Sequence, residues 1–312
     1  MSNISVLIDA LKTQCPNIEL RLNEPMKNHT SFKIGGAVSA MIFPASQEEL
    51  IRVCSLTKEF GVKPFILGNG TNLLFDDKNL DMLVIKTHSG VSGVKLTGDT
   101  EITAESGVLL SRLAVFAAEN GLSGLEFAHG IPGTLGGAVT MNAGAYGGEM
   151  ADVVYSTKAL SGGLREFETT GTEHDFKYRH SRFSDAGDII LGCSLRLFSG
   201  NSEEIRAKME ELSVKRRNSQ PLNMPSGGST FKRPENGYAA AMIEEVGLKG
   251  YTIGGAQVSD KHAGFIINRG GATFEDVCRL MEHVAAEVLR QFGTELEPEV
   301  KIIRGGMEFS VY

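Results

Sequence analysis

HGIPGTLGGAVTMNAGAYGGEM, residues 129–150, says more about the architecture of this chain than any other stretch. Seven glycines fall within nineteen residues: Gly130, Gly133, Gly136, Gly137, Gly144, Gly147 and Gly148. Each glycine costs conformational entropy on folding, so packing alone is a weak reason for removing so many Cβ atoms. We interpret the run as backbone that closely approaches a large, flat ligand.

A second glycine loop, LGNGTNLLF (67–75), follows the strand-like run KPFI. Consecutive backbone N–H groups in such a loop can turn toward one point and bind phosphate without a lysine. No Gly-Lys-Ser/Thr follows, so this is not a Walker loop, and Leu73 stands where a Rossmann fingerprint has its third glycine. Alone the loop also fits a plain β-turn. Two such loops in one domain suit an extended dinucleotide, one holding the pyrophosphate and the other the ring.

The bulk composition describes a folded protein of about two domains. Its 312 residues are 41% hydrophobic and 22% charged, which is ordinary for globular chains. The start, MSNISVLIDALKTQ, has one apolar helical face and lacks the parts of a signal peptide, so we expect a cytoplasmic protein. A net charge of −7 argues against nonspecific nucleic-acid binding.

Cysteines and histidines are scattered along the chain. The four cysteines form no CxxC pattern and are interpreted as reduced, buried thiols: Cys15, Cys54, Cys193 and Cys278. The seven histidines include no HxH or HExxH pair, so the sequence predicts no metal site.

Residues 1–198 predict a mixed α+β region. Runs rich in β-branched and aliphatic residues predict strands at 38–43, 63–68, 81–86 and 188–198. Helices are expected over 47–61 and 111–121, the second beginning at an N-cap, Ser111, and ending at Gly121.

Residues 199–298 predict a second, smaller α+β domain. A helix with an N-cap at Ser202 opens it, and YTIGGAQVS and KHAGFIIN are typical of strands. In TFEDVCRLMEHVAAEVLRQFG, Thr273 and Asp276 resemble a capping box and Gly293 ends the helix. The tail EPEVKIIRGGMEF is expected to pair back onto a sheet.

Between Val214 and Arg233 the chain carries no acid and five cations: Lys215, Arg216, Arg217, Lys232 and Arg233. The stretch is either a solvated basic loop or a local well for a small polyanion, because field focusing depends on the site and not on total charge. Within it lies PSGGSTFKRP (225–234). Its Ser229 is a turn hydroxyl or a reactive one; no GxSxG elbow surrounds it, so a hydrolase nucleophile is poorly supported.

Taken in order, these motifs resemble one family. NHTSFKIGGA, LGNGTNLLF and the 129–150 stretch look like the FAD-binding loops of the UDP-N-acetylenolpyruvoylglucosamine reductases. The similarity continues through YRHSRF (178–183), PSGGSTFKRP, GGAQVSDKHAGFIIN (254–268) and EPEVK (297–301), and so covers nearly the whole chain. It implies an α+β protein with an FAD-binding domain of the vanillyl-alcohol oxidase type and a smaller α+β substrate-binding domain.

The resemblance also implies a division of the chain. The FAD-binding region would cover 1–198, in two lobes of about 1–60 and 61–198. The substrate-binding domain would cover 199–298, and the tail, 299–312, would return to the FAD-binding region.

The implied activity is an NADPH-dependent reduction. It converts the enolpyruvyl group of UDP-N-acetylglucosamine enolpyruvate to the lactyl ether of UDP-N-acetylmuramate, a step of peptidoglycan precursor synthesis. FAD is the implied cofactor, NADPH the hydride-donating co-substrate and the sugar nucleotide the substrate. We expect a monomer without nucleic-acid or membrane partners.

The resemblance assigns binding residues position by position. The implied FAD contacts are Ile34, Gly35, Gly36, Gly68, Asn69, Gly70, Thr71, Asn72, Gly133, Thr134, Gly136, Gly137, Ala138, Asn142, Gly144, Ala145, Tyr178 and Arg179. The implied substrate contacts are Lys215, Arg217, Lys232, Arg233, Gln257 and Lys261, with His262 a weaker candidate.

Three residues are implied in catalysis. Ser229 would donate the proton to the carbon beside the substrate carboxylate, and Arg179 would place a planar bidentate donor near that carboxylate. Glu299 would complete the site. From the residues alone, Arg179 could instead be a surface arginine in an ion pair, and Glu299 an ordinary exposed glutamate of a loop.

The sequence departs from the family pattern at three points. Arg233 stands where some members have asparagine, and Lys301 replaces the arginine usual after the E-V pair. No tyrosine-bearing insertion follows YRHSRF, so the chain resembles the shorter type. A flavin-dependent sugar or alcohol oxidase on the same fold is an alternative, which GGSTF and EPEV argue against, and a non-catalytic binding protein is another.

Overall fold

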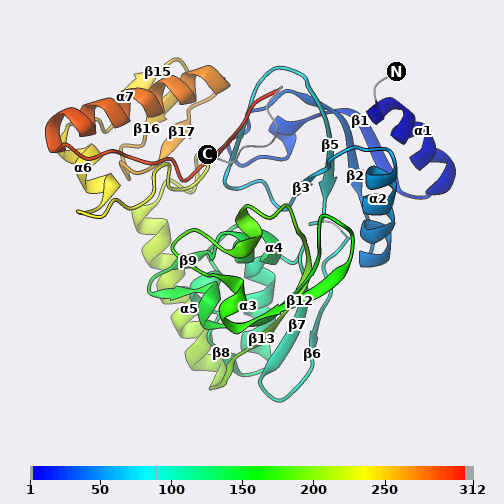
Figure 1. The fold of residues 1–312 in the computed structure, drawn as a ribbon. Helices are drawn as coiled ribbons and strands as arrows, with labels where there is room; N and C mark the ends of the chain where they lie inside the picture. The colour runs from blue at the N-terminus through cyan, green and yellow to red at the C-terminus, as the bar shows by residue number, and fades with distance from the viewer. Residues whose placement is uncertain (1–2, 89, 306–312) are drawn as a thin grey trace. The chain divides into compact units, whose positions relative to one another are not determined.

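The computed structural model describes residues 3–88 and 90–305 and has the mixed α+β content that the sequence predicts (Figure 1). The α-helices are α1 (Asn3–Gln14), α2 (Gln47–Glu59), α3 (Leu110–Glu119), α4 (Leu135–Thr140), α5 (Ser202–Ser219), α6 (Ala239–Glu245) and α7 (Phe274–Phe292). The strands are β1 (Glu19–Pro25), β2 (Ala37–Phe43), β3 (Phe65–Leu67), β4 (Leu73–Phe75), β5 (Leu80–Lys86), β6 (Val94–Leu96), β7 (Glu101–Glu105), β8 (Leu122–Ser123), β9 (Gly144–Ala145), β10 (Gly148–Glu149), β11 (Val154–Leu160), β12 (Glu166–Thr170), β13 (Ile189–Arg196), β14 (Phe198–Ser199), β15 (Thr252–Ile253), β16 (Ala256–Val258), β17 (Ile266–Asn268) and β18 (Lys301–Ile303).

The chain forms two compact units. Unit 1 contains residues 1–22, 40–69 and 82–215, and unit 2 contains 23–39, 70–81 and 216–312. Unit 2 is therefore built from the C-terminal third together with two short segments from the first hundred residues. Which segments bind cofactor and which bind substrate, the basis of the division at residue 198, stays a prediction.

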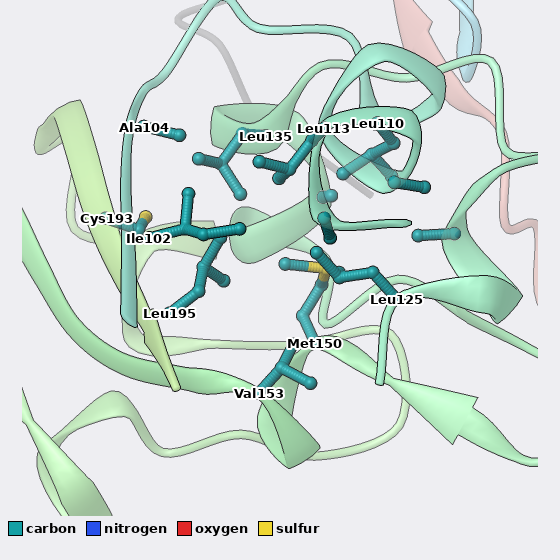
Figure 2. Close-up of a cluster of buried hydrophobic side chains, with 14 of the residues drawn as sticks. Ile102, Ala104, Leu110, Leu113, Leu125, Leu135, Met150, Val153, Cys193 and Leu195 are labelled. Carbon is teal, nitrogen blue, oxygen red and sulfur yellow. The ribbon is translucent and has the colours of Figure 1, made fainter. Parts of the chain in front are cut away.

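A five-stranded sheet organises most of unit 1. Its strand order is β12-β11-β13-β7-β6, and every adjacent pair is antiparallel. Apolar residues of β7 and β13 meet those of α3 and α4 in one buried cluster, where Ile102, Leu113, Leu135 and Leu195 are fully buried (Figure 2). The glycine-rich stretch thus contributes α4 to the core that carries the sheet.

The N-terminal helices of unit 1 cover a second core. α1 and α2 contact one another and bury Leu7, Leu11 and Leu50 with apolar residues of β2 and β5. The predicted apolar face of the first helix is confirmed, because Leu7 and Leu11 are buried and Ile4 and Ile8 pack against the same cluster. The sheet to which these strands belong has the order β1-β2-β5-β3.

Unit 2 packs α6 and α7 with a small sheet of order β15-β16-β17, which lies beside α7 in Figure 1. Its buried cluster also contains Phe32, Leu74, Phe231 and Val300, so the short segments share the same core. The predicted return of the tail is seen where β18 pairs in parallel with β4. Residues 306–312 of that tail lie outside the described residues.

The observed helix ends confirm one set of predicted capping residues and contradict two others. Thr273 and Asp276 form the predicted capping box of α7, and Gly293 ends it with a φ of 64°. Two predicted N-caps are wrong. Ser111 lies inside α3, whose N-cap is Leu109, and the side chain of Asn201 accepts from Glu203 N (2.8 Å) at the start of α5. The N-cap of α5 is therefore Asn201, one residue before the predicted Ser202.

Candidate active site

The segment 225–232 of unit 2 lies between two other segments and is hydrogen-bonded to both. On one side, Thr230 N–H donates to the Gly264 carbonyl (2.8 Å) and Asn268 N–H donates to the Pro225 carbonyl (2.8 Å). On the other side, Glu299 N–H donates to the Thr230 carbonyl (2.8 Å). The backbone that carries Ser229 is therefore held from two directions.

The pairing of the Ser229 segment with residues 297–299 determines which of these residues lies next to the neighbour of Ser229. Phe231 and Pro298 form an antiparallel bridge, which places Glu299 opposite Thr230, the neighbour of Ser229. The Asn72 side-chain amide donates to the Glu299 carbonyl (2.9 Å), and Lys301 N–H donates to the Asn72 carbonyl (3.0 Å). The side chain of Asn72, an implied FAD contact, is thus hydrogen-bonded to the backbone of Glu299, an implied catalytic residue.

The two glycines of PSGGSTFKRP serve different purposes. A Cβ at Gly227 would overlap the ring of Phe32, which is fully buried. Gly228 has a φ of 83°, a left-handed conformation that side chains disfavour, and a Cβ there would meet nothing within 4 Å. Gly227 is required by packing, whereas Gly228 is required by backbone conformation next to open space.

Four of the cations predicted to bind substrate have a side-chain contact within their own unit. Lys232 pairs with Glu297, the Arg233 guanidinium lies 4.2 Å from the centroid of the Tyr238 ring, and Lys261 Nζ donates to the Arg217 carbonyl. In unit 1, Lys215 pairs with Glu211 (2.6 Å). Hydrogen bonds from Lys215 and then Lys208 lower the pKa of Glu211 to about 2.

Gln257 and His262 face inward. Gln257 is buried and its amide donates to the Gly250 carbonyl (3.0 Å), holding the turn before β15. His262 Nδ1 accepts from Gly264 N–H (3.2 Å), and burial lowers the pKa of His262. Contacts of either with substrate stay predictions.

The loops implied in FAD binding are packed tightly against the chain itself. In unit 2, a Cβ at Gly36 would overlap the Lys78 carbonyl, and one at Gly70 would overlap the His29 carbonyl. In unit 1, a Cβ at Gly68 would overlap the Thr134 hydroxyl, and one at Gly136 would press on Ser106 (3.0 Å). For these glycines, contact between loops is by itself enough to exclude a side chain. Contact of their backbone with FAD stays a prediction.

Some glycine-loop groups nevertheless suit a bound dinucleotide. A Cβ at Gly147 would meet nothing within 4 Å. Among the described residues, the backbone N–H groups of Asn69, Gly70 and Thr71 donate to no acceptor. Three successive N–H groups without an acceptor in the chain can bind a phosphate if they turn toward it, so the residues present fit FAD. Of the remaining implied contacts, Ile34 and Ala138 are buried and Ala145 is half-buried.

The side chain of Asn142 links two predicted motifs of unit 1. Asn142 is 1% exposed; its amide donates to the Lys177 carbonyl (3.2 Å) and its Oδ1 accepts from Ala151 N–H (2.9 Å). These bonds join the glycine-rich stretch to the turn that carries Tyr178 and Arg179. A direct contact of Asn142 with FAD stays a prediction.

Arg179 sits at the tip of a tight hairpin. Lys177 and His180 exchange both backbone hydrogen bonds (3.1 Å each), and Arg179 has a φ of 55°. The Asp175 carboxylate accepts from Lys177 Nζ (2.9 Å) and contacts His180 Nε2 (3.3 Å). The Lys177 hydrogen bond is the main cause of the lowered Asp175 pKa. Tyr178 is exposed, and the Arg179 guanidinium lies 5.0 Å from the centroid of its ring.

Two serines anchor the far end of this hairpin. Ser181 Oγ (2.9 Å) and Ser184 Oγ (2.7 Å) both donate to the Thr140 carbonyl, the last carbonyl of α4. Before the hairpin, buried His174 lies 4.8 Å from the Phe176 ring in a stacked pair, and its Nε2 meets Thr157 Oγ1 (2.9 Å). Burial lowers the pKa of His174.

Sequence reasoning missed several of these supporting residues. Thr230, Asp175 and Ser181 were not singled out, although each lies within four residues of an implied catalytic residue. Proximity in sequence was the available signal. The partners of Thr230 and Ser181 lie far along the chain, whereas those of Asp175, Lys177 and His180, are local.

Comparison with known proteins settles the family. A family model described as an FAD binding domain matches residues 38–163, and one described as the UDP-N-acetylenolpyruvoylglucosamine reductase C-terminal domain matches residues 220–303. The UDP-N-acetylenolpyruvoylglucosamine reductase of Caldanaerobacter subterraneus subsp. tengcongensis is 49% identical over 298 residues, 96% of this chain and 98% of the relative. The chain belongs to the UDP-N-acetylenolpyruvoylglucosamine reductase family.

Further UDP-N-acetylenolpyruvoylglucosamine reductases agree. That of Syntrophomonas wolfei subsp. wolfei is 46% identical over 290 residues, 92% of this chain and 96% of the relative. The crystal structure of the Thermus caldophilus enzyme matches with a TM-score of 0.78 at 33% identity, covering 92% of this chain and 99% of that one.

Family membership confirms several predictions made from sequence. The α+β fold with an FAD-binding domain, the class of flavoprotein oxidoreductase, and FAD and NADPH as cofactor and co-substrate are all confirmed. Within residues 3–88 and 90–305, no helix combines the length and apolar character needed to cross a bilayer. The same residues hold no cluster of three or more metal-binding side chains.

Proposed function

We propose that this chain reduces UDP-N-acetylglucosamine enolpyruvate to UDP-N-acetylmuramate, with Ser229 as proton donor and Glu299 and Arg179 beside the reacting group. The observation that carries the proposal is the antiparallel pairing of residues 230–232 with 297–299, in a chain of this family. It sets Glu299 opposite the neighbour of Ser229, so two implied catalytic residues share one small framework.

When bound, FAD supplies the hydride, which originates from NADPH. Asn69, Gly70 and Thr71 would hold its phosphates through their backbone N–H groups. Residues on the glycine-rich stretch and on the Tyr178–Arg179 turn complete the cofactor contacts in this proposal. Residues 1–198 would then carry most of the cofactor site and 199–298 most of the substrate site.

Ser229 completes the reduction by protonation. Addition of hydride to the terminal carbon of the enolpyruvyl group leaves an electron pair on the carbon beside the carboxylate. The Ser229 hydroxyl gives its proton to that carbon, forming a C–H bond and leaving an alkoxide that solvent reprotonates. A serine hydroxyl is a weak acid, but an enolate-like carbanion is a strong base, so the transfer needs chiefly correct placement.

Arg179 and the cations stabilise negative charge. A guanidinium donates two parallel hydrogen bonds to a carboxylate, which suits the charge that develops next to the reacting carbon. Lys232 and Arg233 follow Ser229 directly in sequence and would exchange their present partners, Glu297 and Tyr238, for substrate anions.

The test separates the two half-reactions under anaerobic conditions. NADPH first reduces the flavin of the holoenzyme; UDP-N-acetylglucosamine enolpyruvate is then added and flavin re-oxidation is followed by absorbance. Ser229→Ala should leave the first step intact and slow the second by about 10²–10⁴-fold, the usual contribution of a general acid. Equal loss in both steps would assign Ser229 a structural role. Absence of re-oxidation in the unmodified enzyme would refute the proposed substrate.

We also expect the enzyme to work in the cytoplasm as a monomer. NADPH and nucleotide sugars are cytoplasmic compounds, and each described unit has its own buried core. Sedimentation of the holoenzyme at micromolar concentration measures the oligomeric state directly.

A further inference from the structure

We infer that Thr230 is a positioning residue for protonation: its buried hydroxyl fixes the backbone that presents Ser229. The inference rests on the proposed role of Ser229. Thr230 is 1% exposed, so it is placed to act through its neighbour and not by touching substrate.

Every polar group of Thr230 is committed to one of the two flanking segments. Its N–H donates to the Gly264 carbonyl (2.8 Å) and its carbonyl accepts from Glu299 N–H (2.8 Å). Its Oγ1 accepts from Ile266 N–H (3.0 Å), at the first residue of β17. Thr230 is therefore the point at which the Ser229 segment is tied to both neighbours at once.

The restraint nearest to Ser229 lies on its C-terminal side. Pro225 and Ser226 are hydrogen-bonded to other segments, but Gly228, immediately before Ser229, has a φ of 83° and a Cβ there would meet nothing within 4 Å. Immediately after it, Thr230 makes four hydrogen bonds to two segments, including one that its carbonyl accepts from Val300 N–H (3.5 Å). Thr230 is therefore the fixed point nearest to Ser229.

The side chain of Thr230 contributes what backbone alone does not. Any residue other than proline could make the backbone bonds to Gly264 and Glu299, but the bond from Ile266 N–H needs a side-chain acceptor at this position. Ile266 is 1% exposed, so loss of that acceptor would leave a buried N–H unsatisfied. The backbone near Ile266 and Thr230 would have to shift to relieve it, and Ser229 would move with it.

Three holoenzyme variants test this: Thr230→Val keeps the shape without the hydroxyl, Thr230→Ser keeps the hydroxyl, and Thr230→Ala lacks both hydroxyl and methyl. We expect Thr230→Val to slow flavin re-oxidation by about tenfold to a hundredfold, the cost of misplacing a reacting group by about 1 Å. Flavin reduction by NADPH and the KM for the sugar nucleotide should stay unchanged, and Thr230→Ser should restore the rate.

The decisive measurement is Thr230→Val in a Ser229→Ala background. If Thr230 acts through the Ser229 hydroxyl, its replacement adds no further loss once that hydroxyl is gone. An equal loss in both backgrounds, or slowing of both half-reactions, overturns the inference. If Thr230→Val does not fold, Thr230→Ala compared with Thr230→Ser measures the same contribution.

Failure of the inference differs from failure of the proposed function. If Thr230→Val re-oxidises its flavin at the normal rate while Ser229→Ala does so slowly, only the positioning role of Thr230 is overturned. If Ser229→Ala itself re-oxidises at the normal rate, Ser229 is not the donor and both proposals fall.

Discussion

Two segments present the proposed catalytic side chains by different means. In unit 2, the segment 225–232 is held by buried groups: Thr230 and Phe231 are 1% and 5% exposed. In unit 1, the hairpin that carries Arg179 has an exposed tip, with Tyr178 51% exposed and Asp175 paired at the surface, and buried Asn142 and Ser181 anchor its ends. One segment is fixed by pairing inside a core, and the other combines buried anchors at its ends with surface contacts at its tip.

The difference predicts different tolerance to mutation. Removal of one partner of a buried hydrogen bond costs about 1–3 kcal/mol, because the other partner is left unsatisfied. An exposed ion pair contributes about 0–1 kcal/mol, because water replaces the lost partner. The Ser229 segment should therefore be the more sensitive of the two.

The largest effect should come from Glu299, whose backbone is fixed by the buried segment. Glu299→Ala should slow flavin re-oxidation by about 10²–10⁴-fold, in line with the loss of an acid or base in the site. Stopped-flow absorbance after anaerobic addition of substrate measures the rate. Glu297→Ala is the matched control, because Glu297 lies two residues away and pairs with Lys232 on the exposed side. Similar losses in both variants would contradict a specific role for Glu299.

Gly227→Ala should destabilise the protein by about 1–3 kcal/mol, because its methyl group would overlap the buried Phe32 ring and overpack the core. Urea unfolding of the holoenzyme measures the change. The cost should shrink in a Phe32→Leu background, where the ring is absent.

Gly228→Ala provides the comparison. Its cost, about 1–2 kcal/mol for a left-handed side-chain residue, should be the same with Phe32 or Leu at position 32. If Phe32→Leu relieved both alanine variants equally, the separate reasons given for the two glycines would be wrong.

A smaller effect is expected in the hairpin. Ser181→Ala removes one of two hydroxyls that donate to the Thr140 carbonyl and should lower stability by about 0.5–1.5 kcal/mol, because Ser184 still satisfies that oxygen. The double variant with Ser184→Ala should cost more than the two single changes together, as measured by urea unfolding. Strict additivity would show that the two serines do not share the restraint.

The smallest effect concerns pH and the base of the hairpin. Burial depresses the pKa of His174 in the folded state, so the unfolded chain binds its proton more readily. The stability from neutral His174 is present above the unfolded pKa, near 6.5, and is lost as the pH falls toward the depressed folded value. The melting temperature should therefore decline below about pH 6.5.

His174→Asn should flatten this decline, although it lowers stability at neutral pH by removing the stacking contact with Phe176. His262 in unit 2, also with a pKa lowered by burial, should retain its own share of the slope. An unchanged slope in the variant would show that His174 does not contribute to the pH dependence.

Local patterns predicted local structure well. The capping box of α7 joins Thr273 and Asp276, three residues apart, and such short-range chemistry is visible in the sequence. The apolar face of α1 was visible for the same reason. The N-cap of α5 was misplaced by one residue, because Asn201 and Ser202 are both good caps and sequence alone does not rank them.

The glycine loops show what local reasoning could not supply. Dense glycine in residues 129–150 was interpreted as backbone that approaches a ligand, which stays a prediction. At Gly36, Gly68 and Gly70 the approaching group is another loop of the same chain. The spacing of glycines in the sequence does not indicate which other loop of the chain packs against each of them.

The sequence by itself determined the family, the cofactor class and the identity of the proposed donor, because ordered motifs and local chemistry are properties of the chain. Only the tertiary structure decided how the donor is held. The partners of Thr230 lie at Gly264, Ile266 and Glu299, more than thirty residues away, and the Cβ at Gly227 is excluded by Phe32, nearly two hundred residues earlier. Long-range pairing of this kind follows from burial and register in the folded core, which no local pattern specifies.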